Sequence, residues 1–155
     1  MVGTRRQHCT AAIGLLALLL AASPAAAQWS LPRLGGGAPL DQAAISSGPV
    51  IVIVWTTWSP RGGDIVARMN RIEGQWGRRA RVVSVVFQES PAAIDRFLEG
   101  KRLVVPVFMD SGNAEFSKRN NVTQVPRLLV FKDGVAAVNV NLTDDPDPLI
   151  DGAIK

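Results

Sequence analysis

The sequence reads VIVIVWTTWSPRG over residues 50–62. Its first five residues form a continuous run of β-branched side chains, which is typical of a strand buried on both faces of a sheet. The pattern then becomes helical, because apolar residues recur at helical spacing at Ile65, Met69, Ile72 and Trp76. We therefore predict a buried strand over 50–54 that leads directly into a helix over 60–76, and Gly77 ends that helix.

Outward from this stretch, strands and helices alternate along the chain. Further strands are predicted over residues 82–87, 104–109, 127–132 and 135–140. Further helices are predicted over residues 90–100, 114–119 and 147–155, with Ser90 as the cap of the first. Pro106 places its strand near a sheet edge, and Asp133-Gly134 is a strong hairpin signal. This order predicts an α/β fold, a mixed central β-sheet with helices on both faces.

The first residues have the features of an export signal. Arg5 and Arg6 precede an apolar run over residues 11–22, and small residues follow up to Ala27. The run is shorter than the about 20 apolar residues that a membrane-spanning helix needs.

The predicted domains are a signal peptide over 1–27, a lead-in over 28–48 that covers the domain edge, and one folded domain over 49–155. The predicted location is the bacterial periplasm. The alternative is that an uncleaved N-terminal segment anchors the chain to the inner membrane.

The composition excludes several kinds of chemistry. The 155-residue sequence has one His and one Cys, His8 and Cys9, and both lie within the predicted signal. The exported chain therefore lacks the ligands of a soft metal site, a thiol nucleophile and the histidine of a Ser-His-Asp relay. Removing Arg5 and Arg6 lowers the net charge from +4 to about +2, which argues against a nucleic-acid partner. We expect no metal and no cofactor.

Two segments resemble the hallmarks of the thioredoxin family. Residues 50–62 are similar to the strand-to-helix turn in which that family carries Trp-Cys-x-x-Cys at the start of the helix. Residues 122–134, in which a hairpin follows Pro126, resemble the family's cis-proline segment. Residues 82–110 are similar to the periplasmic TlpA- and ResA-like group. The resemblance covers about residues 40–155 and implies a thioredoxin fold.

The chain departs from that family at the reactive positions. Ser59 and Gly62 stand where the family has its two cysteines, and Ile53 stands where many members keep a buried acid. A serine hydroxyl cannot form a disulfide, and glycine has no side chain to resolve one. The resemblance therefore implies a thioredoxin fold without thiol-disulfide exchange, and we expect no catalytic residue.

The candidate site is a groove between the degenerate turn and the cis-proline segment. By resemblance, one side of it is formed by Trp58, Ser59, Pro60, Arg61 and Gly62. The other side is formed by Val125, Pro126 and Arg127, where the family holds an extended client chain. We predict that Ser59 caps the helix and is not a nucleophile, since no histidine is available as a base. Asp64 is expected to be a favourable charge at the helix N-terminus, not an acid catalyst.

Several side chains have two interpretations. Trp58 is either an exposed anchor for a partner or a residue retained for packing. Arg61 and Arg127 would form an anion site if they face each other beside the helix N-terminus; we favour the alternative that both are solvated. A basic stretch is expected to be a solvated face, with an acidic partner or anionic lipid as the alternative: Arg68, Arg71, Arg78, Arg79 and Arg81. The remaining tryptophans are assigned to packing: Trp29, Trp55 and Trp76.

These features together favour a non-enzymatic role. We expect a redox-inactive thioredoxin-like protein of the cell envelope that binds a client or partner protein during assembly or maturation, a role that the resemblance suggests. The alternative is an enzyme related to thiol-disulfide oxidoreductases that acts through a partner thiol or a cofactor. The lack of Cys and His beyond residue 9 weighs against it. A membrane partner is expected only if the signal segment is uncleaved.

Overall fold

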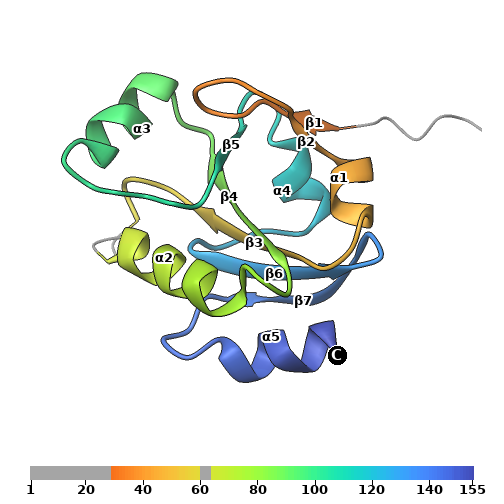
Figure 1. Ribbon diagram of the computed structural model, residues 1–155. Helices are drawn as coiled ribbons and strands as arrows, with labels where there is room; N and C mark the ends of the chain where they lie inside the picture. Colours follow the sequence, from red (N-terminus) through yellow and green to blue (C-terminus); the bar gives the residue numbers. More distant parts are fainter. Residues whose placement is uncertain (1–28, 60–63) are drawn as a thin grey trace, which may run out of the picture.

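The computed structural model describes residues 29–59 and 64–155, and its centre is a five-stranded mixed sheet (Figure 1). The strand order is β5-β4-β3-β6-β7. The strands are β3 (Val50–Trp55), β4 (Arg81–Phe87), β5 (Val107–Asp110), β6 (Arg127–Lys132) and β7 (Val135–Asn141). β3 runs parallel to β4, and β4 parallel to β5, whereas β6 is antiparallel to both β3 and β7. The predicted mixed sheet is confirmed.

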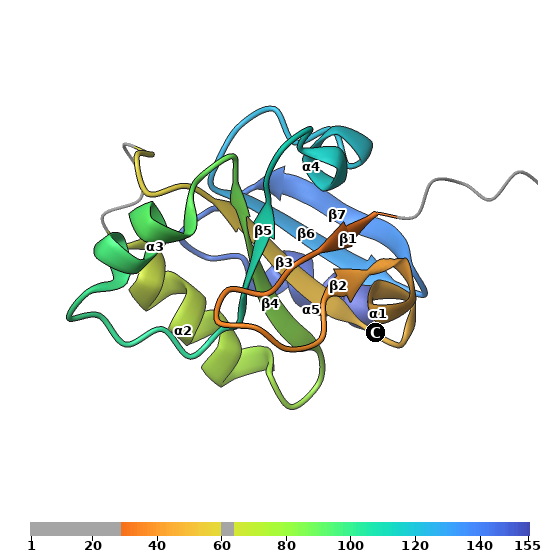
Figure 2. The same cartoon turned by 90° about the horizontal axis from the view of Figure 1, so that it is seen from above.

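Helices cover both faces of the sheet, and β3 contributes to both layers. Its residues are at most 1% exposed, as expected of a strand with alternating side chains in two cores. Ile51, Ile53 and Trp55 belong to a core with α2 (Ile65–Trp76), α3 (Pro91–Leu98) and α5 (Asp147–Ile154). Val50, Val52 and Val54 belong to a core with α1 (Gln42–Ser46) and α4 (Glu115–Arg119). Figures 1 and 2 show these helices on opposite sides of the sheet.

The segment before β3 lies along one edge of the sheet and also contributes to the core. It contains β1 (Ser30–Leu31), β2 (Leu40–Asp41) and α1. Arg33 bridges to Phe108 on β5, and the Leu34 N–H donates to the Val107 carbonyl at 2.9 Å. Trp29 is 5% exposed and meets Phe116 edge-on, with the ring centroids 5.0 Å apart. The outer edge of β5 is thereby covered, which protects an edge strand from unwanted pairing.

The first long helix starts later than the sequence suggests. α2 begins at Ile65, and Asp64 occupies its N-cap position without a side-chain cap bond. The prediction that Ser59 caps this helix is therefore wrong. Two consecutive glycines, Gly62 and Gly63, oppose an early helix start, because each costs about 1 kcal/mol relative to alanine in a helix. Pro60, Arg61 and Gly62 lie outside the described residues.

The other predicted boundaries hold closely. The Ser90 hydroxyl accepts a hydrogen bond from the Ala93 N–H at 3.3 Å and caps α3. β5 is an edge strand, as predicted, but it starts at Val107, three residues after the predicted start at 104. Pro106 lacks the N–H of a ladder donor and lies before the strand instead of within it. Asp133 and Gly134 both have positive φ, 52° and 78°, which is the requirement of the two-residue hairpin predicted between β6 and β7.

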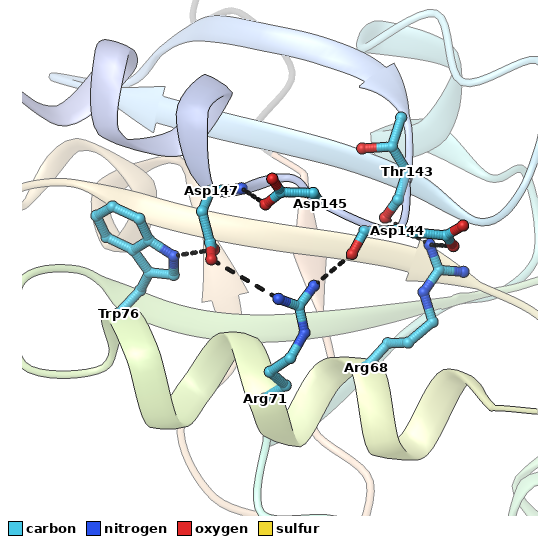
Figure 3. A network of polar contacts seen from close by, with 7 residues as sticks. All are labelled: Arg68, Arg71, Trp76, Thr143, Asp144, Asp145 and Asp147. Carbon is cyan, nitrogen blue, oxygen red and sulfur yellow. Dashed lines mark hydrogen bonds and ion pairs between the residues drawn. The ribbon is translucent and has the colours of Figure 1, made fainter.

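Two arginines of the basic stretch, Arg68 and Arg71, bond to the segment that leads into the C-terminal helix (Figure 3). Arg68 donates to the Thr143 carbonyl at 2.6 Å, and Arg71 donates to the Asp144 carbonyl at 2.7 Å. The Trp76 indole N–H donates to Asp147 at 2.7 Å. The expectation of a wholly solvated basic face is therefore wrong at Arg68, which is partly buried, whereas Arg71 stays exposed. The partners of both arginines and of Trp76 lie more than 70 residues away in the sequence.

The C-terminal helix adds a charge cluster of its own. Arg79 lies 3.2 Å from Asp151, and Lys155 lies 2.5 Å from the same carboxyl group. Hydrogen bonds from Lys155 and then Arg79 lower the pKa of Asp151. Arg71, Arg78, Arg79 and Arg81 are all exposed, so the predicted solvated face holds for four of the five arginines, although Arg71 and Arg79 also bond to the C-terminal segment.

Candidate functional site

A groove opens where β3 and β4 end, the edge at which open α/β sheets bind ligands. Its volume is about 410 Å³. Its lining comes from the turn after β3, the end of β4 and the segment before β6: Trp58, Ser59, Phe87, Val122, Thr123, Gln124 and Val125. The structure thus brings the two segments quoted for the family resemblance to the same place.

Direct contact joins the two sides at the base of the groove. The Ser59 hydroxyl donates to the Val125 carbonyl at 3.4 Å, although 66 residues separate the two in the sequence. Ser59 is 8% exposed, and the Val125–Pro126 peptide bond is cis. The serine proton therefore faces a backbone carbonyl, and no base among the described residues accepts it. This geometry does not activate Ser59 as a nucleophile.

Trp58 forms the rim of the groove. Its side chain is 64% exposed, whereas Trp55, Trp29 and Trp76 are at most 5% exposed. The assignment of these three to packing is confirmed. Trp58 instead presents most of its ring to solvent, as an interface anchor would.

Glu89 supports the turn that carries Trp58 and was not anticipated from the sequence. Its carboxylate accepts from the Thr57 N–H at 2.6 Å and from the Thr57 hydroxyl at 2.7 Å. Charge-assisted bonds of this kind are about twice as strong as neutral ones. They tie the end of β3 to the loop after β4. Because Thr57 and Glu89 are 32 residues apart, no local sequence pattern predicts this pair.

Arg127 is engaged with β7 and does not point a free charge into the groove. Its Nε donates to the Asn139 side-chain oxygen at 2.6 Å, and its Nη1 donates to the Asn141 side-chain oxygen at 3.0 Å. A third bond runs from Nη2 to the Asn139 carbonyl at 3.0 Å. Arg61 lies outside the described residues, so the anion site formed with Arg127 stays a prediction.

The same asparagines hold the groove wall. Asn139 donates to the Asn120 carbonyl at 2.6 Å, and Asn141 donates to the Gln124 side-chain oxygen at 3.0 Å. Arg127 thereby acts through two strand residues on the loop that supplies Val122 to Val125. The sequence does carry a weak signal of this network, since two asparagines at alternate positions of a strand lie on one face.

Little in the described residues suggests bond-making chemistry at this site. Ile53, at the family's acid position, is fully buried at 0% exposure among apolar side chains. Among residues 29–59 and 64–155, no group of three or more His, Cys, Asp or Glu side chains is placed to hold a metal. The groove is suited to contact and hydrogen bonding.

The strand order, the helices on both faces and the groove between a strand–turn and a cis-proline segment together define a thioredoxin fold. Solved structures bear this out. A secreted disulfide oxidoreductase of Mycobacterium tuberculosis is 21% identical, with a TM-score of 0.64 over 81% of this chain and 93% of that one. An exposed lipoprotein thioredoxin of Streptococcus pneumoniae is 15% identical, with a TM-score of 0.69 over 82% of this chain and 98% of that one.

A thiol:disulfide interchange protein of Chlorobium tepidum is likewise similar. It is 19% identical, with a TM-score of 0.66 over 83% of this chain and 94% of that one. The structural neighbours are thus thioredoxin-like thiol:disulfide oxidoreductases, as the resemblance to the TlpA- and ResA-like group implies. No protein-family model and no curated protein matches the sequence. At these identities the likeness concerns the fold.

Proposed function

We propose that this protein holds an extended segment of a client or partner protein in the groove beside Pro126, without exchanging disulfides. The observation that carries the proposal is the Ser59 hydroxyl, which donates to the Val125 carbonyl at the base of the groove. The position of the family's attacking thiol is thus filled by a group that bonds to the groove wall. The groove itself is retained, with a volume of about 410 Å³, within the usual range of ligand sites.

Thiol chemistry argues for the same proposal. Disulfide exchange needs a thiolate that attacks one sulfur and a second thiol that releases the product. The only cysteine of the sequence is Cys9, and the described residues contain none. A partner thiol or a cofactor would have to supply the electrons in the alternative function, an enzyme related to thiol-disulfide oxidoreductases.

The lining favours an extended, largely apolar segment. Trp58, Phe87, Val122 and Val125 give the groove its apolar surface, and none of the described residues that line it is charged. Extended peptides bind such edges through backbone hydrogen bonds and fill adjoining pockets with alternate side chains. Exposed tryptophan is among the residues that most often dominate binding energy.

We also propose that the protein works outside the cytoplasm. The basic start and short apolar run of residues 1–27 support export, and one structural neighbour is a secreted protein while another is an exposed lipoprotein. In the ranges 29–59 and 64–155, no helix has the length and hydropathy to span a bilayer. The periplasm is the proposed location, and retention on the inner membrane by residues 1–27 is the alternative; residues 1–27 lie outside the described residues.

Two measurements on residues 28–155 test the proposal. The first is reduction of insulin disulfides with dithiothreitol, where we expect a rate equal to the blank. The second is binding of carboxymethylated α-lactalbumin, an unfolded chain with blocked thiols, monitored by fluorescence anisotropy. We expect binding that weakens severalfold in Trp58→Ala and stays unchanged in Leu149→Ala. Leu149 is a matched control because it is a 41% exposed apolar residue on α5.

The outcomes separate the two functions. Insulin turnover above the blank would replace the binding function by the enzymatic alternative. Equal loss of binding in both variants, or no binding at all, would remove the groove as the interaction surface.

A further inference from the structure

A second hollow adjoins the groove. It has a volume of about 290 Å³. Phe87, Val122 and Thr123 line both hollows, so the two lie side by side. The other residues around the second hollow come from the loop after β4, from α4 and from the residues next to it: Gln88, Ala114, Ser117, Lys118 and Asn121.

Asp110 fixes the position of α4 beside this hollow. Its buried carboxylate accepts from the Ser117 N–H at 2.8 Å and from the Phe116 N–H at 3.3 Å. Phe116 is fully buried, at 0% exposure, in the core on that side of the sheet. The Asp110 carboxylate and the buried Phe116 ring therefore hold α4 in place. The exposed Lys118 side chain takes no part in holding the helix.

Lys118 has no partner in the part of the chain that the structure describes. No hydrogen bond or ion pair reaches its ammonium group across residues 29–59 and 64–155. Within the ranges 29–59 and 64–155, Lys118 is also the only charged residue that lines either hollow. An unpaired cation next to an uncharged apolar groove favours a ligand that brings a negative charge to one end only.

Ser117 adds a second polar group at the floor of the same hollow. It is 1% exposed, and its hydroxyl oxygen has no hydrogen-bond partner among the described residues. A buried hydroxyl without a partner costs free energy, which an acceptor that enters the hollow would recover. Both features of the hollow therefore favour an acceptor such as a carboxylate.

We infer that the segment bound by this protein carries an acidic side chain next to its apolar anchor. The inference rests on the proposed function and adds a specificity to it. The apolar side chain occupies the groove between Trp58 and Val125, and the aspartate or glutamate occupies the second hollow at Lys118. Side chains on one side of an extended chain recur about every 7 Å, so adjoining hollows are served by residues two or four positions apart.

Matched peptides test this specificity. The peptides are acetylated and amidated, carry a rhodamine label and place one Leu in a Gly/Ser background. Each peptide carries one kind of test residue, Asp, Asn or Lys, at the positions two and four residues before and after the Leu. Amidation removes the C-terminal carboxylate, so the test residues supply the only difference in charge. We expect the Asp peptide to bind about two- to fivefold more tightly than the Asn peptide at low salt, the range of a partly exposed ion pair. The Lys peptide should bind most weakly.

The protein variants keep the assay specific to the second hollow. Lys118→Met should abolish the preference for Asp over Asn, and Lys118→Glu should transfer the preference to the Lys peptide. Arg81→Met lowers the net charge equally but changes an exposed residue at the opposite end of β4, so it should leave the preference intact. Thermal unfolding of each variant verifies that the fold is unchanged.

Each outcome decides a different statement. Equal binding of the Asp and Asn peptides to the wild type overturns the acidic specificity and leaves the proposed function in place. Loss of the preference in Arg81→Met assigns it to net charge and also overturns the second hollow. Failure of all the peptides, together with failure of the unfolded chain, overturns the proposed function itself.

Discussion

Replacing Asn139 by alanine removes the central member of the network behind the groove wall. The substitution deletes two bonds of 2.6 Å, one accepted from the Arg127 Nε and one donated to the Asn120 carbonyl. A hydrogen bond to a charged group contributes about 1.5–3 kcal/mol and a neutral one about 1 kcal/mol. Arg127 keeps its bonds to the Asn139 carbonyl and to Asn141, so we take the lower end and expect a loss of about 2 kcal/mol.

Urea unfolding of residues 28–155 measures this loss. With a slope of about 2 kcal/mol/M, typical of small domains, the midpoint should fall by about 1 M. The matched control is Asn113→Ala, an exposed asparagine without a hydrogen bond in the described residues, which should change the free energy of unfolding by less than about 0.5 kcal/mol.

The groove wall supplies an independent measurement for the same variant. Hydrogen exchange of the amides over residues 120–125 should accelerate in Asn139→Ala, because this loop loses one of its two side-chain bonds to β7 and keeps the one from Asn141 to Gln124. Asn139→Asp should retain the bond to Arg127 and place a carboxylate against the Asn120 carbonyl, so it should also accelerate exchange. If Asn139→Ala unfolds within 0.5 kcal/mol of the wild type and exchanges at the wild-type rate, the network does not position the wall and the reasoning is refuted.

Two further changes test the support of the fold. Asp110→Ala should lower the free energy of unfolding by about 2–3 kcal/mol, because it leaves the N–H groups of Phe116 and Ser117 buried without acceptors; a loss below about 0.5 kcal/mol in urea unfolding would contradict this. Asp151→Asn should flatten the acid limb of stability against pH. The folded pKa of Asp151 is lowered, so its contribution is present above the unfolded pKa of about 3.9 and is lost as pH falls through the folded pKa. An unchanged acid limb would contradict this.

The sheet was predictable from the sequence because its signals are local. The β-branched run at 50–54 and the Asp133-Gly134 turn each depend on neighbouring residues alone. The start of α2 was placed too early although Gly62 and Gly63 oppose a helix there; what could not be predicted locally is the partner of Ser59, whose hydroxyl bonds to Val125, 66 residues away. Serine is a common helix-capping residue, and the local sequence could not show that the Ser59 hydroxyl instead bonds to a distant backbone carbonyl.

The supporting polar residues of the site were missed for the same reason. Glu89 reaches Thr57 across 32 residues, and Arg68 reaches Thr143 across 75. Such pairings follow from strand order and helix placement, which the sequence predicts only coarsely. Arg127 was predicted to form one side of the groove, but it is not among the described residues that line it, and its hydrogen bonds to Asn139 and Asn141 place it behind the groove wall.

The distribution of these supports explains how a thioredoxin fold can retain its groove without its sulfur chemistry. The turn is held by Glu89, the wall by Asn139 and Asn141, and the helix beside the second hollow by Asp110. None of these contacts uses the positions of the two family cysteines. At one of these positions the Ser59 hydroxyl bonds to the Val125 carbonyl across the base of the groove. A serine in place of the family's thiol therefore adds one weak contact there and leaves the other supports unchanged. The shape of the groove is thus held by residues other than those at the two family cysteine positions, as the proposed binding function requires.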